Sequence, residues 1–235
     1  MAFFQMLLPR QRTLIHFCDI STDKDSVALS QTVLEFYAQN WKGIADFLPI
    51  KKTLLQLISL AHPLVVVDIT GGTGSLLCDV ASSLPADSNI SLTFLERPEV
   101  VAFAKTGDVP SSPAINFSIG DIFKGPLPRA DLYLLSRVLH DWDDFRAGHI
   151  LRRIHKYSKA GATLSVIDHC ATSENMHSLL SLHMYQLQKA FERTSSQWLT
   201  LFKKTEWIVV DRSTFHEHEI FILEKTNDGR DASTR

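Results

Sequence analysis

Acidic side chains and one histidine stand where apolar runs of the sequence end. Asp68 follows L-V-V-V, Glu96 closes I-S-L-T-F-L, Asp121 comes shortly after I-N-F-S-I, and His140 follows L-Y-L-L-S. Such runs are typical of buried parallel strands, whose carboxyl ends share one edge of a sheet and bind ligands there. At that edge carboxylates can accept hydrogen bonds from a ligand, and a histidine of pKa about 6.5 can take a proton from a bound hydroxyl.

The turn after Asp68 is rich in glycine, with Gly71, Gly72 and Gly74 close together. Glycine allows positive φ and a close approach of the backbone to a ligand. The first glycine of a G-x-G-x-x-G fingerprint would fall at Thr70, and no lysine fits a P-loop, so a phosphate cradle is disfavoured. Two interpretations stay open: a site for a nucleotide-like cofactor, or a tight connection from strand to helix.

Each candidate residue also has a purely structural interpretation. Glu96 can accept hydrogen bonds from both hydroxyls of a ribose, or it can be a surface glutamate. Asp121 can accept from an adenine amino group, or it can bond the backbone of its own turn. His140 is one of ten histidines, most of which must be surface or packing residues. A catalytic base needs an orienting group, and Glu192 in F-E-R-T is a candidate that spacing alone does not bring near.

The composition excludes several classes of function. The formal net charge of -2 leaves no basic excess for binding nucleic acid. The opening M-A-F-F-Q-M-L-L-P is too short to span a membrane and lacks the basic start of a signal peptide. The three cysteines form no C-x-x-C pair, so neither a disulfide framework nor a zinc site is indicated. We therefore expect a cytoplasmic protein without a membrane or nucleic-acid partner.

The pattern from Leu64 onward alternates strands with helices, which predicts a parallel sheet covered on both faces. We expect strands over 64–69, 90–95, 115–119, 131–135 and 163–168, and helices after the glycine turn, near Pro98 and over 144–157. Two last β-rich runs, 207–211 and 219–223, are joined by too few residues for a parallel crossover and must form an antiparallel hairpin. Residues 1–63 are predicted to be a helical cover, 64–225 the main domain, and 226–235 a disordered tail.

The predicted fold is therefore α/β, a Rossmann-like seven-stranded sheet with a C-terminal antiparallel hairpin. By analogy at the level of the fold, a reversed last strand after five parallel ones is typical of class I S-adenosylmethionine methyltransferases. A nicotinamide-binding Rossmann domain normally continues with a sixth parallel strand. The hairpin favours S-adenosylmethionine as the cofactor.

Several longer motifs resemble the caffeate-type O-methyltransferases over about Val66 to Lys225. They are R-P-E-V-V at 97–101, G-D-I-F-K-G-P-L-P at 120–128, A-D-L-Y-L-L-S-R-V-L-H-D-W at 130–142 and E-R-T at 192–194. The resemblance implies that His140 is the catalytic base and that Glu192 positions it. It also implies cofactor contacts from the glycine turn, from strand ends and from the segment before His140, namely Gly72, Glu96, Gly120, Asp121, Ile122 and Arg137.

The chain departs from this family at recognisable places. Thr70 stands where the family has the first glycine of the motif, and Glu206 replaces the glycine of a late Gly-Phe pair. The family is homodimeric through an N-terminal domain, and 63 residues are too few to hold it. That domain builds much of the acceptor pocket in the family.

The sequence thus predicts methyl transfer from S-adenosylmethionine to a hydroxyl of a small aromatic acceptor. By resemblance the acceptor is N-acetylserotonin, the precursor of melatonin, and no metal is needed because His140 removes the proton. The alternative is a catalytically impaired binding or regulatory subunit that keeps the fold. Thr70 and the short N-terminal segment favour the alternative, whereas His140 and Glu192 favour the enzyme.

Overall fold

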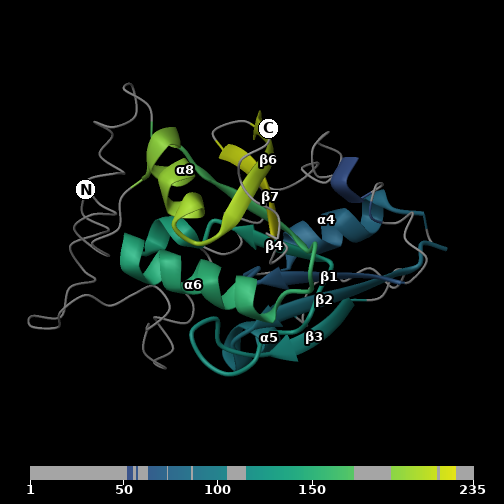
Figure 1. Cartoon of the computed structure of the whole chain (residues 1–235). Helices are drawn as coiled ribbons and strands as arrows, with labels where there is room; N and C mark the ends of the chain where they lie inside the picture. The colour runs from purple at the N-terminus through teal and green to yellow at the C-terminus, as the bar shows by residue number, and fades with distance from the viewer. Residues whose placement is uncertain are drawn as a thin grey trace, which may run out of the picture.

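The computed structural model describes residues 52–54, 57, 63–72, 74–85, 87–104, 115–171, 192–215 and 218–225 (Figure 1). The helical cover predicted over 1–63 lies almost entirely outside the described residues. The tail predicted over 226–235 lies wholly outside them.

The core of the protein is a seven-stranded sheet with the order β3-β2-β1-β4-β5-β7-β6. Its strands are β1 (Leu64–Ile69), β2 (Ile90–Glu96), β3 (Ile115–Ile119), β4 (Leu132–Ser136), β5 (Thr163–His169), β6 (Trp207–Phe215) and β7 (His218–Lys225). The first five strands pair in parallel, whereas β7 runs antiparallel to both β5 and β6. This arrangement confirms the predicted class I methyltransferase sheet and its C-terminal hairpin.

The hairpin is longer than the sequence pattern predicts. Phe215 pairs with His218, so β6 and β7 continue almost to the connecting turn, and the ladder carries an irregularity between Val209 and Asp211. Side chains along β6 alternate between buried or half-buried and exposed positions over the whole strand. That alternation is the period of a strand with one covered face, and it extends through the polar residues that the prediction assigned to a loop.

Four α-helices and one short 3-10 helix connect the described strands: α4 (Ser75–Ser83), α5 (Pro98–Ala104), η4 (Leu139–Asp141), α6 (Asp144–Tyr157) and α8 (Ser195–Lys203). Asp143 caps α6 by accepting a hydrogen bond from the main chain of Arg146. Thr194 and Gln197 form a capping box at the start of α8. Both caps satisfy main-chain N–H groups that the first turn of a helix leaves unpaired, so these two helix starts are set locally.

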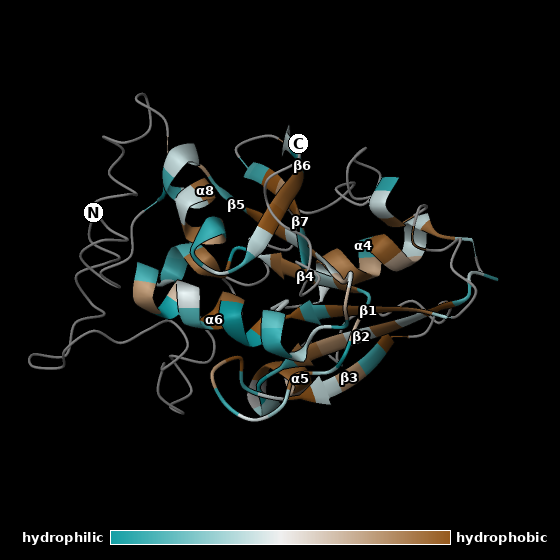
Figure 2. Cartoon of the chain, in the orientation of Figure 1, coloured by the Kyte–Doolittle hydropathy of each residue, from teal (hydrophilic) through white to brown (hydrophobic). Residues whose placement is uncertain are grey.

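Two hydrophobic cores lie on opposite faces of the sheet. One contains α6, α8 and alternate strand residues such as Val67 and Tyr133. The other contains α4, Val101 of α5 and the intervening residues, such as Val66 and Leu134. Figure 2 shows β1 and β4 as mostly apolar and α6 with a polar outer side. The burial on both faces explains why the sequences of the parallel strands are nearly continuous apolar runs.

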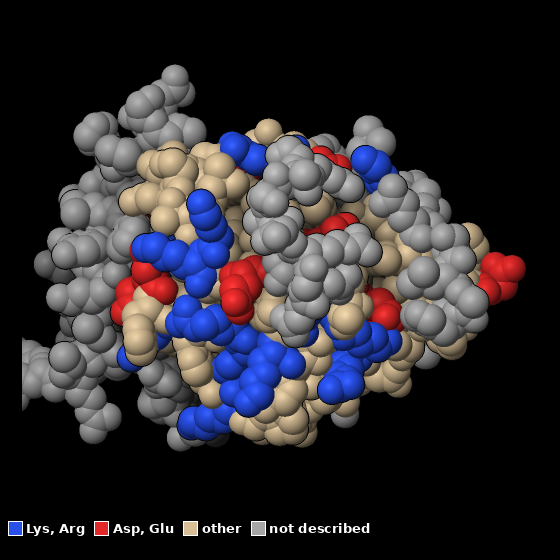
Figure 3. Space-filling model, in the orientation of Figure 1, with Lys and Arg blue, Asp and Glu red and all other residues tan. Residues whose placement is uncertain are grey.

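Lysine and arginine side chains gather on the face that carries α6 (Figure 3). Arg146, Arg152 and Lys156 are exposed there, whereas Asp143 and Asp144 mark the start of the same helix. This is the solvated side of an amphipathic helix, whose last turn carries the basic residues His155 and Lys156, as the helix dipole favours. Among the described helices, none has both the length and the apolarity needed to cross a membrane.

Candidate active site

Five parallel strands place their carboxyl ends along one edge of the sheet, and the predicted site residues other than Glu192 lie at or shortly after these ends. β1 lies between β2 and β4 in the sheet, so the chain reverses its direction of winding at this point. The edge beside such a switch point is where open α/β sheets bind ligands. The structure therefore brings the ends of β1, β2, β3 and β4 into one region, as the sequence predicts.

Asp68 lies near the end of β1 in this region. Its side chain is fully buried, and within the described part of the chain neither carboxylate oxygen has a hydrogen-bond partner. Burial, with a smaller contribution from the Glu96 carboxylate, raises the pKa of Asp68 to about 7. A Cβ at Gly71 would lie 2.2 Å from Asp68 Oδ2, so a side chain at position 71 would collide with this acid. A buried polar group without a partner is costly, and a ligand that donates to it would remove that cost.

Glu96 and Gly120 lie together at the neighbouring strand ends. Glu96 is 7% exposed, and its Oε1 accepts a hydrogen bond of 2.9 Å from the main chain of Arg97. Gly120 donates its N–H to the main-chain oxygen of Glu96 at 3.0 Å. Gly72, in the turn after β1, has a φ of 62°. The surface interpretation of Glu96 is wrong, because its side chain is buried at the ligand edge.

Asp121 and Ile122 make local contacts. Oδ1 of Asp121 accepts a hydrogen bond of 2.7 Å from the main chain of Phe123, and Lys124 lies 3.7 Å from its Oδ2. This is the turn aspartate that bonds its own backbone, the alternative interpretation that the sequence left open. Ile122 packs into the core that contains α6. The contacts that both residues are predicted to make with a cofactor stay predictions.

Thr70 holds a backbone conformation that suits glycine. Its φ is 56°, its N–H donates to Leu95 O at 2.9 Å, and its hydroxyl donates to Ile69 O at 2.6 Å. A β-branched residue is especially unfavourable in the left-handed region because its side chain crowds the following carbonyl. The turn therefore keeps the glycine conformation and carries a local strain.

We expect Thr70→Gly to raise the free energy of unfolding by about 1 kcal/mol, because it removes this strain despite the greater freedom of glycine in the unfolded chain. Urea unfolding measures the change. Thr214→Gly is the matched control: Thr214 is exposed on β6 and is absent from the residues with positive φ, so its replacement should lower stability. Equal losses in the two variants would show that Thr70 is unstrained.

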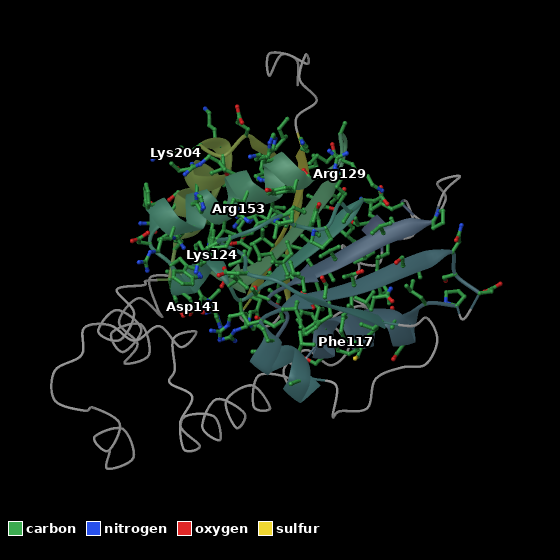
Figure 4. All side chains as sticks on the ribbon, turned by 90° about the horizontal axis from the view of Figure 1, so that it is seen from below. Phe117, Lys124, Arg129, Asp141, Arg153 and Lys204 are labelled. Atoms are coloured by element: carbon green, nitrogen blue, oxygen red, sulfur yellow. The ribbon has the colours of Figure 1, made fainter. Side chains whose placement is uncertain are left out.

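His140 forms a buried dyad with Asp168. His140 lies in η4, directly after β4, and Asp168 lies in the adjacent strand β5. Nδ1 of His140 is 2.6 Å from Asp168 Oδ1, and the main-chain N–H of His140 donates to Asp168 Oδ2 at 3.2 Å. His140 Nε2 lies 3.2 Å from Oδ1 of Asp141, whose side chain is 23% exposed at the edge of the folded body (Figure 4). One carboxylate thus fixes both the ring and the backbone of His140.

Charge around this dyad favours a protonated imidazole. Burial opposes the charged ring, but the carboxylates of Asp168 and Asp141 outweigh burial and raise the pKa of His140 to about 10. Burial alone would raise the pKa of Asp168, and the charge and hydrogen bond of His140 instead hold it below its ordinary value. In this arrangement His140 can act as a base, and the Asp168 carboxylate stabilises the imidazolium that forms when the ring takes a proton.

Two further imidazoles lie beside the dyad and stay neutral. His169 and His218 are a cross-strand pair of β5 and β7, with ring centroids 4.3 Å apart. Burial, and next the charge of Arg137, lowers the pKa of His169 to about 3 and that of His218 to about 4. Nη1 of Arg137 lies 3.2 Å from Nε2 of His218, and Arg137 has a φ of 54°. Arg137 is thus held at the site edge by an uncharged partner.

Glu192 is half-buried at the start of the segment that leads into α8. The structure places Asp168 and Asp141, both described residues, at the two ring nitrogens of His140. The role of Glu192 in orienting His140 stays a prediction. Trp142 is 8% exposed and packs edge-on against Phe123 with ring centroids 4.6 Å apart, as a packing residue of the core does.

Asp168, Asp141 and Arg193 were not predicted from the sequence. Asp168 ends an apolar strand in the same way as Asp68, so the signal that singled out the other acids also marked this one. Asp141 follows His140 directly and carried no separate signal. Arg193 lies inside the E-R-T motif, yet its contacts reach residues about 50 positions away and cannot be predicted from local spacing.

A family model described as an O-methyltransferase domain matches residues 27–207. Acetylserotonin O-methyltransferase of Macaca mulatta is 34% identical over 152 residues, which are 63% of this chain and 43% of the relative. The protein of the same name from Homo sapiens is 35% identical over 152 residues, with the same shares of the two chains. The chain spans less than half the length of these relatives.

A solved structure agrees with these relatives. The crystal structure of human N-acetylserotonin methyltransferase in complex with SAM matches with a TM-score of 0.71 and 26% sequence identity. The match covers 97% of this chain and 63% of the human chain.

Proposed function

Because the chain belongs to the O-methyltransferase domain family, we propose that it transfers a methyl group from S-adenosylmethionine to a hydroxyl of a small aromatic acceptor. The observation that carries this proposal is the buried dyad of His140 and Asp168, which stands at the same sheet edge as Asp68 and Glu96. The reaction requires a base at the same edge as groups that can accept hydrogen bonds from a nucleoside.

The residues at the strand ends fit the cofactor. Asp68 offers two buried oxygens that lack a partner among the described residues, and Gly71 leaves no side chain between that acid and a ligand. Glu96 presents a carboxylate where the ribose hydroxyls of a nucleoside would lie. Arg137 and Gly120 lie on either side, at the ends of β4 and β3.

When bound, S-adenosylmethionine supplies an electrophilic methyl group. His140 takes the proton of the acceptor hydroxyl at Nε2, while Asp168 holds Nδ1–H and stabilises the charged ring that results. In this structure Oδ1 of Asp141 lies 3.2 Å from Nε2 of His140, so the acceptor hydroxyl must replace Asp141 at this nitrogen. The raised pKa of His140 means that the ring must first lose a proton, so the rate depends on pH.

The acceptor that we propose is N-acetylserotonin, which would place the reaction in melatonin synthesis. The names of the relatives support this choice, together with the segment S-R-V-L-H-D-W that carries the base. We also propose a cytoplasmic protein that binds neither nucleic acid nor membrane. A methyl-transfer assay with N-acetylserotonin and with simple phenols tests the proposal. Transfer to neither class, despite binding of the cofactor, would contradict it.

Glu96→Ala is expected to weaken binding of S-adenosylhomocysteine by about 1 to 3 kcal/mol, because charge-assisted hydrogen bonds to the ribose are lost. Calorimetric titration measures the affinity. Glu224→Ala is the control, because Glu224 is exposed and pairs with Thr163 at the opposite end of the sheet. An unchanged affinity in Glu96→Ala would remove Glu96 from the proposed cofactor site.

Methyl transfer should proceed at the same rate in the presence of EDTA, because His140 removes the hydroxyl proton without a metal ion. The measurement is the initial rate with and without the chelator. Loss of activity with EDTA and its recovery with magnesium would show that His140 is not sufficient as the base.

A binding or regulatory subunit is the second candidate function, and the strained Thr70 favours it. In that case the cofactor binds but no hydroxyl is methylated. Thr70→Gly should then improve cofactor affinity without creating transfer, because the turn relaxes while the acceptor side is unchanged.

A further inference from the structure

The guanidinium of Arg193 donates hydrogen bonds to two main-chain oxygens of the turn that carries His140. Nη1 donates to Leu139 O at 2.9 Å, and Nη2 donates to Trp142 O at 2.7 Å. These two carbonyls flank His140 and Asp141 in the sequence, so one rigid group spans both residues. Arg193 is fully buried, although it is an arginine.

Three other elements meet at the same arginine. Its Nε donates to Asp144 Oδ1 at 2.8 Å, at the start of α6, and its guanidinium lies over the ring of Trp198 in α8 at 4.9 Å. Its main-chain oxygen accepts a hydrogen bond of 2.9 Å from Ala171, shortly after β5. Trp198 Nε1 in turn donates to His169 O at 3.0 Å. The arginine therefore links the histidine turn to the strand that holds Asp168.

The turn itself has few strong bonds of its own. Asp141 N–H donates to Val138 O at 3.3 Å, and Trp142 N–H donates to Leu139 O at 3.2 Å. Both distances are longer than those of the two bonds from Arg193, which also come from a charged donor. The geometry of this 3-10 turn thus depends more on Arg193 than on its internal hydrogen bonds.

We propose that Arg193 is a positioning residue for His140, which sets the turn so that the imidazole keeps its contact with Asp168 and presents Nε2 to the acceptor. Arginine suits this role because its planar fork reaches two carbonyls and a carboxylate at once, whereas lysine has a single ammonium group. Only the kinetic part of the proposal rests on the proposed methyl transfer. The contact between His140 and Asp168 can be followed without turnover.

Arg153 provides a matched control. Its guanidinium also donates to two main-chain oxygens, those of Ile122 and Gly125, and it lies in α6. Figure 4 shows Arg153 well apart from Asp141, the neighbour of His140. Arg153→Lys therefore removes the same kind of clamp from a different loop, and its loss of thermal stability provides a baseline.

The experiment compares wild type, Arg193→Lys and Arg153→Lys by NMR titration of the His140 Cε1–H, which is assigned by its absence in His140→Gln. In Arg193→Lys we expect the His140 midpoint to move down toward the ordinary value of about 6.5, because the ring loses part of its contact with Asp168. We expect turnover at saturating substrates to fall about tenfold to a hundredfold with S-adenosylhomocysteine affinity unchanged. Arg153→Lys should keep the wild-type midpoint of His140, because its clamp holds the loop of Ile122 and Gly125 rather than the histidine turn.

The positioning role is wrong if Arg193→Lys keeps the wild-type midpoint and turnover, or if Arg153→Lys shifts both equally. If Arg193→Lys does not fold, Asp144→Ala replaces it, because it removes the carboxylate that accepts from Nε and the Asp144 side chain is 65% exposed. A smaller downward shift of the midpoint supports the proposal, and no shift overturns it. If wild type transfers no methyl group, the proposed function fails while the titration still decides the role of Arg193.

Discussion

Replacing His140 with glutamine is expected to lower the rate of methyl transfer by about 10²-fold to 10⁴-fold, because the chain loses the group that accepts the hydroxyl proton. The affinity for S-adenosylmethionine should stay close to that of wild type, since Nε2 of the imidazole faces Asp141 and the acceptor side of the edge. Single-turnover rates measure the chemical step, and calorimetric titration measures binding. His140→Gln should therefore bind S-adenosylmethionine as wild type does but transfer the methyl group much more slowly.

The wild-type rate should rise with pH, because only the neutral imidazole accepts a proton. Asp168 and Asp141 raise the pKa of His140, so the midpoint of the rise should lie above the ordinary value of about 6.5. His149→Gln is the control, because His149 is exposed on α6 and stacks on Phe123. Equal activity in His140→Gln and His149→Gln would exclude His140 as the base.

Asp168→Asn is expected to lower turnover by about 10²-fold or more, because the amide neither stabilises the imidazolium nor selects the tautomer with a free Nε2. Removal of its negative charge lowers the pKa of His140, so the rise of the remaining activity should move to lower pH. The pH profile of single-turnover rates measures both effects.

Asp131→Asn is the matched control for this prediction. Asp131 is also a buried aspartate, but it precedes β4 at the opposite end of the sheet, where it accepts from Val65 N and pairs with Lys159. Its replacement should lower stability and leave the midpoint of the pH profile in place. An Asp168→Asn profile that coincides with that of wild type would show that Asp168 does not act on His140.

The strand ends were the predictable part of the site. Buried parallel strands must be apolar on both faces, so Asp68, Glu96 and His140 could be placed from the points at which apolar runs end. The partners of these residues were harder to predict. Asp168 contacts His140 across 28 positions and Arg193 contacts Leu139 across 54, and such pairs are set by sheet order and helix packing rather than by local pattern.

Two residues that depart from the family pattern have a left-handed backbone. Thr70 and Glu206, which stand where the family has glycine, have φ values of 56° and 64°. The backbone therefore keeps the left-handed turn at both positions, although the side chain disfavours it. The sequence predicts a steric conflict at Thr70. Only the structure shows that the turn accommodates the threonine with its backbone still in the left-handed region.

The antiparallel strand β7 lies between β5 and β6 in the sheet, although it is the last of the three in the chain. During synthesis on a ribosome, β5 therefore leaves the exit tunnel before β7 has been made. One edge of β5 stays unpaired until β7 follows and His218 pairs with His169. The intervening stretch of about 50 residues takes a few seconds at about 5–20 residues per second. Until then Arg137 lacks His218, and the edge of β5 is open to pairing with other nascent chains. A ribosome that stalls inside this stretch would leave a chain that already contains Asp68, Glu96, His140 and Asp168 but lacks the strand that pairs with β5 and brings His218 to Arg137.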